Sequence, residues 1–103
     1  MIEGIWKFAM DGEDGNLYWI FNNNVFVRVE SGDPTPDYGT YEYDEDEQVL
    51  VVFEDIEGPS EYKVVELTLN NLKLQIGGET VTFTRYNGSI QNLEDELNLE
   101  IEI

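Results

Sequence analysis

Apolar and polar residues alternate along most of this chain with the period of two that is typical of β-strands. The alternation is clear in residues 2–10, where Ile2, Trp6 and Phe8 share one parity. Short polar, glycine-rich or asparagine-rich turns separate this segment from seven others of similar character, which are residues 17–21, 25–30, 38–44, 48–54, 61–69, 72–76 and 79–86. The pattern predicts an all-β fold, an antiparallel up-and-down meander of eight strands. Such a sheet avoids exposed edges by closing into a small barrel.

Three local signals support these boundaries. The run Asn22–Asn24 predicts a tight turn, because asparagine tolerates unusual backbone geometry. The pair Gly77-Gly78 is typical of a two-residue hairpin. Within residues 61–69 the apolar parity switches near Glu66, which predicts a β-bulge.

The residues after the eighth strand follow a different pattern. Ser89 is a good helix cap, and Ile90, Leu93 and Leu97 follow at helical spacing. Residues 98–103 alternate once more and predict a further strand. We therefore interpret residues 1–103 as a single domain, with barrel strands in 1–86 and a helix and strand extension in 87–103.

Alternation also assigns side chains to the inside or the outside of the barrel. The predicted inner face comprises Trp6, Phe8, Leu17, Trp19, Phe21, Val25, Val27, Tyr41, Tyr43, Val49, Val51, Phe53, Tyr62, Val64, Leu72, Leu74, Val81 and Phe83. Several apolar residues have the opposite parity, namely Ile5, Tyr18, Ile20, Phe26, Leu50, Val52 and Val65. Apolar residues that point outward are expected to be covered by other protein atoms. The three candidates are the C-terminal helix, a second copy of the chain and a partner protein. The residues that we consider for a partner interface are Tyr18, Ile20, Phe26, Leu50 and Val52.

Charge and composition exclude several functions. The chain has 23 acidic and 5 basic residues and a net charge of −18, which argues against binding of nucleic acid or an anionic membrane. The acidic surface either serves solubility or faces a basic partner. Histidine and cysteine are absent, so the commonest general base and the thiolate nucleophile are missing. We expect no enzyme activity and no cofactor.

The segment Asp11–Asn16 superficially resembles a calcium loop, but Gly15 stands where a third ligand belongs. We therefore expect no metal site. No apolar run is long enough for a membrane helix, and we expect no membrane insertion. If Met1 is the natural first residue, we expect a cytoplasmic protein. If a leader has been removed, we expect a protein of the bacterial cell envelope or a secreted one.

The first and the last strands carry a pair of candidate partners. Arg85 is one of few basic residues and ends the eighth strand, whereas Trp6 is the largest residue of the first. A guanidinium can pack on an indole face through a cation–π contact. We predict that Trp6 and Arg85 close one end of the barrel and have a structural role.

These residues carry a family resemblance. Gly4-Ile5-Trp6 resembles the Gly-x-Trp signature of lipocalins, and Arg85 stands where that family has the arginine that covers the tryptophan. The middle of the chain is similar to small bacterial lipocalin-like domains, through Tyr38–Tyr41, Tyr62–Val64, Glu66–Thr68, Leu72–Leu74 and Phe83–Arg85. The resemblance implies a calycin-type barrel that binds a small apolar ligand. The chain is much shorter than a full lipocalin and lacks the family's cysteines and long lid loops.

Two functions remain open at this point. The first is non-catalytic binding of a small apolar or aromatic ligand at the open end of the barrel, where Trp19, Tyr41, Tyr43 and Tyr62 combine apolar rings with polar tips. The alternative is an acidic protein-interaction module, such as an immunity or inhibitor protein, that binds a basic partner. A homodimer through the outer apolar residues is a further possibility. An eight-stranded barrel is either filled by side chains or holds one small ligand.

Overall fold

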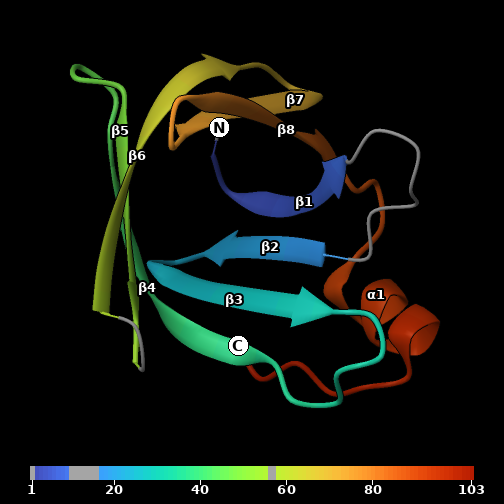
Figure 1. The fold of residues 1–103 in the computed structure, drawn as a ribbon. Coiled ribbons are helices and arrows are strands. Elements are labelled where there is room, and N and C mark those ends of the chain that lie inside the picture. The colour runs from blue at the N-terminus through green and yellow to red at the C-terminus, as the bar shows by residue number, and fades with distance from the viewer. Residues whose placement is uncertain (1, 10–16, 56–57) are drawn as a thin grey trace.

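Eight antiparallel strands follow one another around a closed barrel in the computed structural model of the chain, which describes residues 2–9, 17–55 and 58–103 (Figure 1). Each strand pairs with the next, and β1 also pairs with β8, so the sheet has no free edge. The strands are β1 (Gly4–Ala9), β2 (Leu17–Asn22), β3 (Val25–Glu30), β4 (Asp37–Asp44), β5 (Val49–Glu54), β6 (Gly58–Leu67), β7 (Asn71–Ile76) and β8 (Glu79–Arg85). The predicted fold class is confirmed.

Tight turns connect consecutive strands where the sequence predicts them. Asn23 and Asn24 have φ angles of 48° and 68°, and Gly77 and Gly78 have φ angles of 57° and 85°. Two consecutive residues with positive φ match the twist of an antiparallel hairpin. The predicted bulge is also present, because the register of β6 against β7 shifts between Val64 and Glu66.

The antiparallel order defines two ends of the barrel. We call base the end at which β1 begins and β8 ends, where the β2–β3, β4–β5 and β6–β7 turns also lie. We call mouth the opposite end, where β1 and β3 end and β2 and β4 begin. The two ends differ in chemistry, as described below.

The barrel interior holds a cluster of buried apolar side chains. Its fully buried members include Trp6, Phe21, Phe26, Leu50, Leu72, Leu74 and Phe83. On β1, β2, β7 and β8 this agrees with the predicted inner face. On β3 and β5 the prediction was wrong: Phe26, Leu50 and Val52 lie inside, whereas Val25, Val27, Val49, Val51 and Phe53 have the opposite parity and lie outside. Both faces of β5 are apolar, so alternation alone could not choose between them. On β3 the valine parity is indeed the more apolar one, but Val27 and Val29 are buried in the outer cluster and not in the barrel interior.

A second apolar cluster lies outside the barrel, between the strands β1–β3 and the C-terminal helix α1 (Ile90–Leu97). Figure 1 shows α1 beside β2 and β3. The buried members of this outer cluster are Ile5, Tyr18, Ile20, Val27, Val29, Leu93 and Ile101. The helix begins with a capping box in which Ser89 Oγ accepts from the Asn92 amide at 3.1 Å and Asn92 Oδ1 accepts from the Ser89 amide at 2.9 Å. The predicted helix is confirmed, and it covers part of the outward apolar residues.

The further strand predicted for residues 98–103 does not form. The Ile101 amide donates to Glu94 Oε2 at 2.8 Å, and the Glu102 amide donates to the Tyr38 hydroxyl at 2.9 Å. The alternating apolar residues of this segment contribute to packing: Ile101 is buried in the outer cluster, and Leu99 packs against that cluster. A closed barrel offers no edge to which this segment could add.

Candidate functional site

At the base of the barrel, Trp6 and Arg85 are in contact. Trp6 is fully buried, and Arg85 Cζ lies 4.2 Å from the centroid of its ring. Arg85 Nη1 donates to the Glu3 carbonyl oxygen at 2.9 Å, and Trp6 Nε1 donates to the Ile2 carbonyl oxygen at the same distance. A cation–π contact contributes about 0.5–1 kcal/mol at exposed sites and about 2 kcal/mol when desolvated, and this one joins a buried ring to a partly exposed guanidinium. We call the pair of Trp6 and Arg85 the plug; its closing role stays a prediction, which the variants in the Discussion test.

Gly4 makes room for this plug. Its φ angle is 133°, and a Cβ atom there would lie 2.2 Å from Arg85 Nη1. A glycine two residues before a large buried ring can admit a neighbouring backbone. The structure shows instead that the arginine side chain takes the space, which explains why a glycine stands two residues before Trp6.

Aromatic rings fill much of the interior above the base. The centroid of the Trp19 ring lies 4.7 Å from that of Phe83, 5.3 Å from that of Phe26 and 5.6 Å from that of Tyr62. The Tyr41 ring contacts Phe21 at 4.8 Å. Offset and edge-to-face pairs at such distances add stability beyond their buried area.

The four residues predicted to bind a ligand do not converge at the mouth. Trp19 and Tyr62 are in ring contact inside the barrel. The Tyr41 amide donates to the Asn24 carbonyl oxygen in the β2–β3 turn, which places Tyr41 toward the base. Tyr43 pairs with Leu50, next to the β4–β5 turn, and so also lies toward the base. Of the predicted set, the structure brings together Trp19 and Tyr62.

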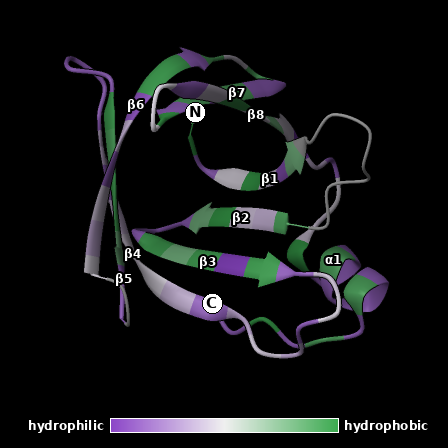
Figure 2. Cartoon of the chain, in the orientation of Figure 1, coloured by the Kyte–Doolittle hydropathy of each residue, from purple (hydrophilic) through white to green (hydrophobic). Residues whose placement is uncertain are grey.

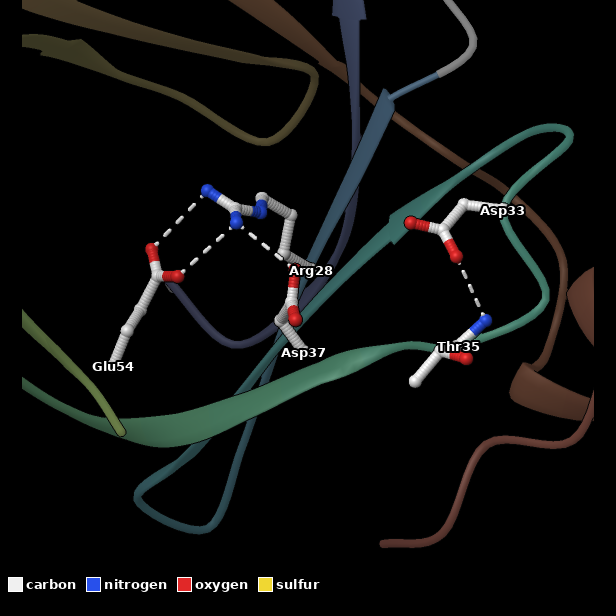
Figure 3. A network of polar contacts seen from close by, with 5 residues as sticks. All are labelled: Arg28, Asp33, Thr35, Asp37 and Glu54. Carbon is white, nitrogen blue, oxygen red and sulfur yellow. Dashed lines mark hydrogen bonds and ion pairs between the residues drawn. The ribbon is translucent and has the colours of Figure 1, made fainter. Parts of the chain in front are cut away.

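The mouth carries a charged cluster that the sequence did not reveal. Arg28 of β3 reaches Asp37 at the start of β4 and Glu54 at the end of β5 (Figure 3). Arg28 Nη2 lies 2.9 Å from Asp37 Oδ2 and 3.3 Å from Glu54 Oε2. The Glu54 side chain is only 11% exposed. The guanidinium thus forms ion pairs with two carboxylates, and the three side chains together have a formal charge of −1.

The inward direction of this cluster follows from strand parity. Arg28 shares its parity with the interior residue Phe26, and Glu54 shares its parity with Val52. Gly39 faces Glu54 across the ladder, and a Cβ atom at Gly39 would lie 1.9 Å from the Phe53 carbonyl oxygen, so β4 and β5 approach closely here. The sequence did offer one hint, because Arg28 is one of only five basic residues. Its partners Asp37 and Glu54 could not be inferred, because they lie on other strands.

The indole N–H of Trp19 is a hydrogen-bond donor without an acceptor among the described residues. Its indole Nε1 is buried and has no hydrogen-bond partner within the described part of the chain. Trp19 is 7% exposed and stands opposite Arg28 in the β2–β3 ladder. A buried donor without an acceptor costs about 1–3 kcal/mol. An acceptor group brought by a ligand would relieve this cost.

The five residues considered for a partner interface are all buried. Tyr18 and Ile20 belong to the outer cluster under α1, whereas Phe26, Leu50 and Val52 lie in the barrel interior. The expectation that they form one outward patch is therefore corrected. The chain's own helix covers the outward members of the set.

Two tyrosines have raised pKa values that make the stability of the fold depend on pH in the alkaline range. Burial raises the pKa of Tyr41 above its usual value, and the charge of Glu3 raises it further. Burial, followed by the charge of Glu96, also raises the pKa of Tyr18. A raised pKa means that the folded state holds its proton more tightly than the unfolded chain.

Below the ordinary tyrosine pKa of about 10, we expect the contribution of these two tyrosines to the free energy of unfolding to stay constant. Above it, the free energy of unfolding should fall as the pH rises through the pKa that the tyrosines have in the folded state. Urea unfolding at pH 8.5 and at pH values above about 10 measures this loss. Tyr41→Phe should show a smaller loss than the parent, because it removes one titrating group. Equal losses in the parent and the variant would contradict the assignment to Tyr41.

The described residues contain no group of three or more side chains suited to hold a metal ion. The acidic segment 11–16, which resembles a calcium loop, lies outside the described residues. No helix in the described ranges has the length and apolar character needed to cross a membrane.

Comparisons with known proteins agree with the barrel. Three solved structures share its fold. A lipocalin-like protein from Bacteroides uniformis ATCC 8492 has a TM-score of 0.69 and 15% identity, covering 82% of this chain and 98% of that one. An uncharacterized protein from Bacteroides eggerthii DSM 20697 has a TM-score of 0.63 and 17% identity, with the same coverage. The NMR structure of another protein from Bacteroides uniformis ATCC 8492 has a TM-score of 0.64 and 20% identity, covering 82% and 88%.

A search of curated proteins found no match to this sequence. The family of lipocalin-like domains matches residues 2–74, which is well over half of the chain and includes Trp6, Trp19, Arg28 and Glu54. With the closed eight-stranded barrel and the plug of Trp6 and Arg85, this match identifies the chain as a member of the lipocalin-like domain family.

Proposed function

We propose that this protein is a non-catalytic binding domain that takes a small aromatic ligand inside the barrel, next to Trp19 and Tyr62. The observation that carries the proposal is the buried indole N–H of Trp19, which has no acceptor among the described residues although rings surround it. Ligand sites commonly combine apolar walls with a few polar groups that fix orientation. The absence of histidine and cysteine from the sequence supports a role without catalysis.

The charges favour a neutral ligand. Arg28 is already paired with Asp37 and Glu54, so among the described residues of this cluster no positive charge is left over for an anion. The net charge of −18 repels anions at longer range as well. A ligand of one or two rings that carries a hydrogen-bond acceptor suits both the rings and the indole N–H. Tyr41 and Tyr43 would line the deeper, base-side part of the same interior.

Quinoline and naphthalene are a suitable pair of probes, because they have the same shape and only quinoline carries a ring nitrogen that accepts a hydrogen bond. The binding of each is measured through the two indole N–H resonances in a proton–nitrogen NMR titration. We expect quinoline to shift the Trp19 resonance. The Trp6 resonance is an internal reference, because its N–H already donates to the Ile2 carbonyl oxygen.

Trp19→Phe keeps a ring and removes the donor. Its binding is followed through the backbone amide resonances, because the variant no longer has the Trp19 indole N–H. A neutral hydrogen bond has a net value of about 0.5–1.5 kcal/mol, so the variant should bind quinoline about twofold to tenfold more weakly and naphthalene almost unchanged. Tyr86→Phe is the control, since Tyr86 packs against the outer cluster, outside the barrel interior. If neither probe perturbs the Trp19 resonance at millimolar concentration, this proposal fails.

A further inference from the structure

The outer face of β4, β5 and β6 carries apolar side chains that neither buried cluster includes. Val49, Val51 and Phe53 alternate along this face of β5, and Phe53 is 38% exposed. Figure 2 shows that β5 is hydrophobic along most of its length. The helix α1 covers the other side of the barrel, over β1–β3. The β5 side chains are therefore left at the surface.

Carboxylates surround this apolar stripe in register with it. Val51 pairs with Glu42 on β4 and with Glu61 on β6, so the three side chains form a row across three strands. In the neighbouring row, Val49 pairs with Asp44 and with Lys63. A shallow groove of about 420 Å³ is lined by Glu42, Asp44, Glu47, Val49, Val51 and Glu61. This groove has an apolar floor and an acidic rim.

The rim carboxylates are available to a cation. The ion pairs within the described residues are Arg28 with Asp37 and Glu54, and Lys73 with Glu66, so none uses Glu42, Asp44, Glu47 or Glu61. Asp44 accepts hydrogen bonds from the amides of Asp46 and Glu47, which fixes its place in the β4–β5 turn. A half-buried valine between two carboxylates that make no ion pair among the described residues is an unfavourable site for a second copy of this chain, because each copy has a net charge of −18.

We propose that the β4–β6 outer face docks a cationic segment of a partner protein, one that places an aliphatic side chain on Val51 and lysine or arginine side chains beside Glu42 and Glu61. Neighbouring strands lie about 4.8 Å apart, so Glu42 and Glu61 are separated by about 10 Å across the row. An extended segment with the spacing Lys-x-Leu-x-Lys puts its three contact side chains on one face over about 13 Å. The long lysine side chains bridge the difference.

This surface is separate from the barrel interior. The proposed partner contacts Glu42, Val51 and Glu61, and not the five apolar residues that the sequence analysis considered for an interface. Electrostatic complementarity of this kind chiefly sets the association rate and the choice of partner. The buried apolar contact adds affinity, because water leaves the valine floor. Both contributions are needed for specific docking, and this requirement defines the test.

The probe is a synthetic peptide in which the unit Lys-Ser-Leu-Ser-Lys is flanked by glycines and both ends are blocked. A second peptide with serine in place of leucine has the same charge. Binding is followed through the backbone amide resonances of the full chain. We expect the leucine peptide to shift resonances of β4, β5 and β6, to bind more tightly than the serine peptide and to weaken as salt is added.

Glu42→Gln with Glu61→Gln removes two rim charges at exposed positions. We expect about fivefold weaker binding, from the size of two exposed ion pairs. The control pair Asp95→Asn with Glu100→Gln removes the same charge from an acidic groove near α1, and its binding should stay within about twofold of the parent. The proposal is overturned if the shifts scatter over the surface, if both double variants weaken binding equally, or if the two peptides bind alike.

Discussion

Removal of residues 87–103 is expected to cost the protein its fold or to cause aggregation. The deletion takes away Leu93 and Ile101, which are buried, and uncovers Ile5, Tyr18 and Ile20. Each large aliphatic side chain that is fully buried contributes about 1.5–3 kcal/mol. The sum over both sides of this interface is comparable to the 5–15 kcal/mol that stabilises a typical small protein. Thermal melting and light scattering of the deleted chain measure the outcome.

A milder variant separates the packing role from a general effect of truncation. Leu93→Ala removes one fully buried side chain and should cost about 2–5 kcal/mol. Gln91→Ala changes an exposed position on the same helix and should cost less than about 0.5 kcal/mol. A deleted chain that stays monomeric with an unchanged melting temperature would show that α1 and the tail do not stabilise the barrel.

The second large effect is expected at the base of the barrel. Trp6→Ala removes a fully buried indole, the cation–π partner of Arg85 and the hydrogen bond to the Ile2 carbonyl oxygen. Large-to-small substitution of this kind costs about 3–5 kcal/mol. For a chain of this length, the melting temperature should fall by about 15 °C or more.

Two further variants test the plug itself. Trp6→Phe keeps an aromatic face beneath the guanidinium but loses the indole N–H, so its loss of stability should be intermediate. Arg85→Ala should cost less than Trp6→Ala, because the arginine remains partly exposed whereas the ring is fully buried. If Trp6→Ala melts within about 2 °C of the parent, the closing role of this residue is wrong.

The sequence alone determined the strand count, the turns and the C-terminal helix, because local physical chemistry decides them. Asn23, Asn24, Gly77 and Gly78 accept the positive φ angles that tight hairpins need. Ser89 caps a helix wherever the next residues have helical spacing. On β1 the two large rings, Trp6 and Phe8, share one parity, and its inner face was predicted correctly. These features required no knowledge of distant neighbours.

Tertiary structure decided the faces of β3 and β5 and the composition of the mouth. The valines of β3 share one parity but are buried outside the barrel in the outer cluster, and β5 is apolar on both parities. Only the pairing with β2 and β4 therefore puts Phe26 and Leu50 inside and leaves Val51 outside. Arg28 and Glu54 are 26 residues apart in the chain and meet because β3, β4 and β5 are neighbours. The last residues read as a strand, but the closed barrel has no edge to pair with. The amide of the buried Ile101 needs an acceptor, which the Glu94 carboxylate supplies, and the amide of the exposed Glu102 donates to the Tyr38 hydroxyl.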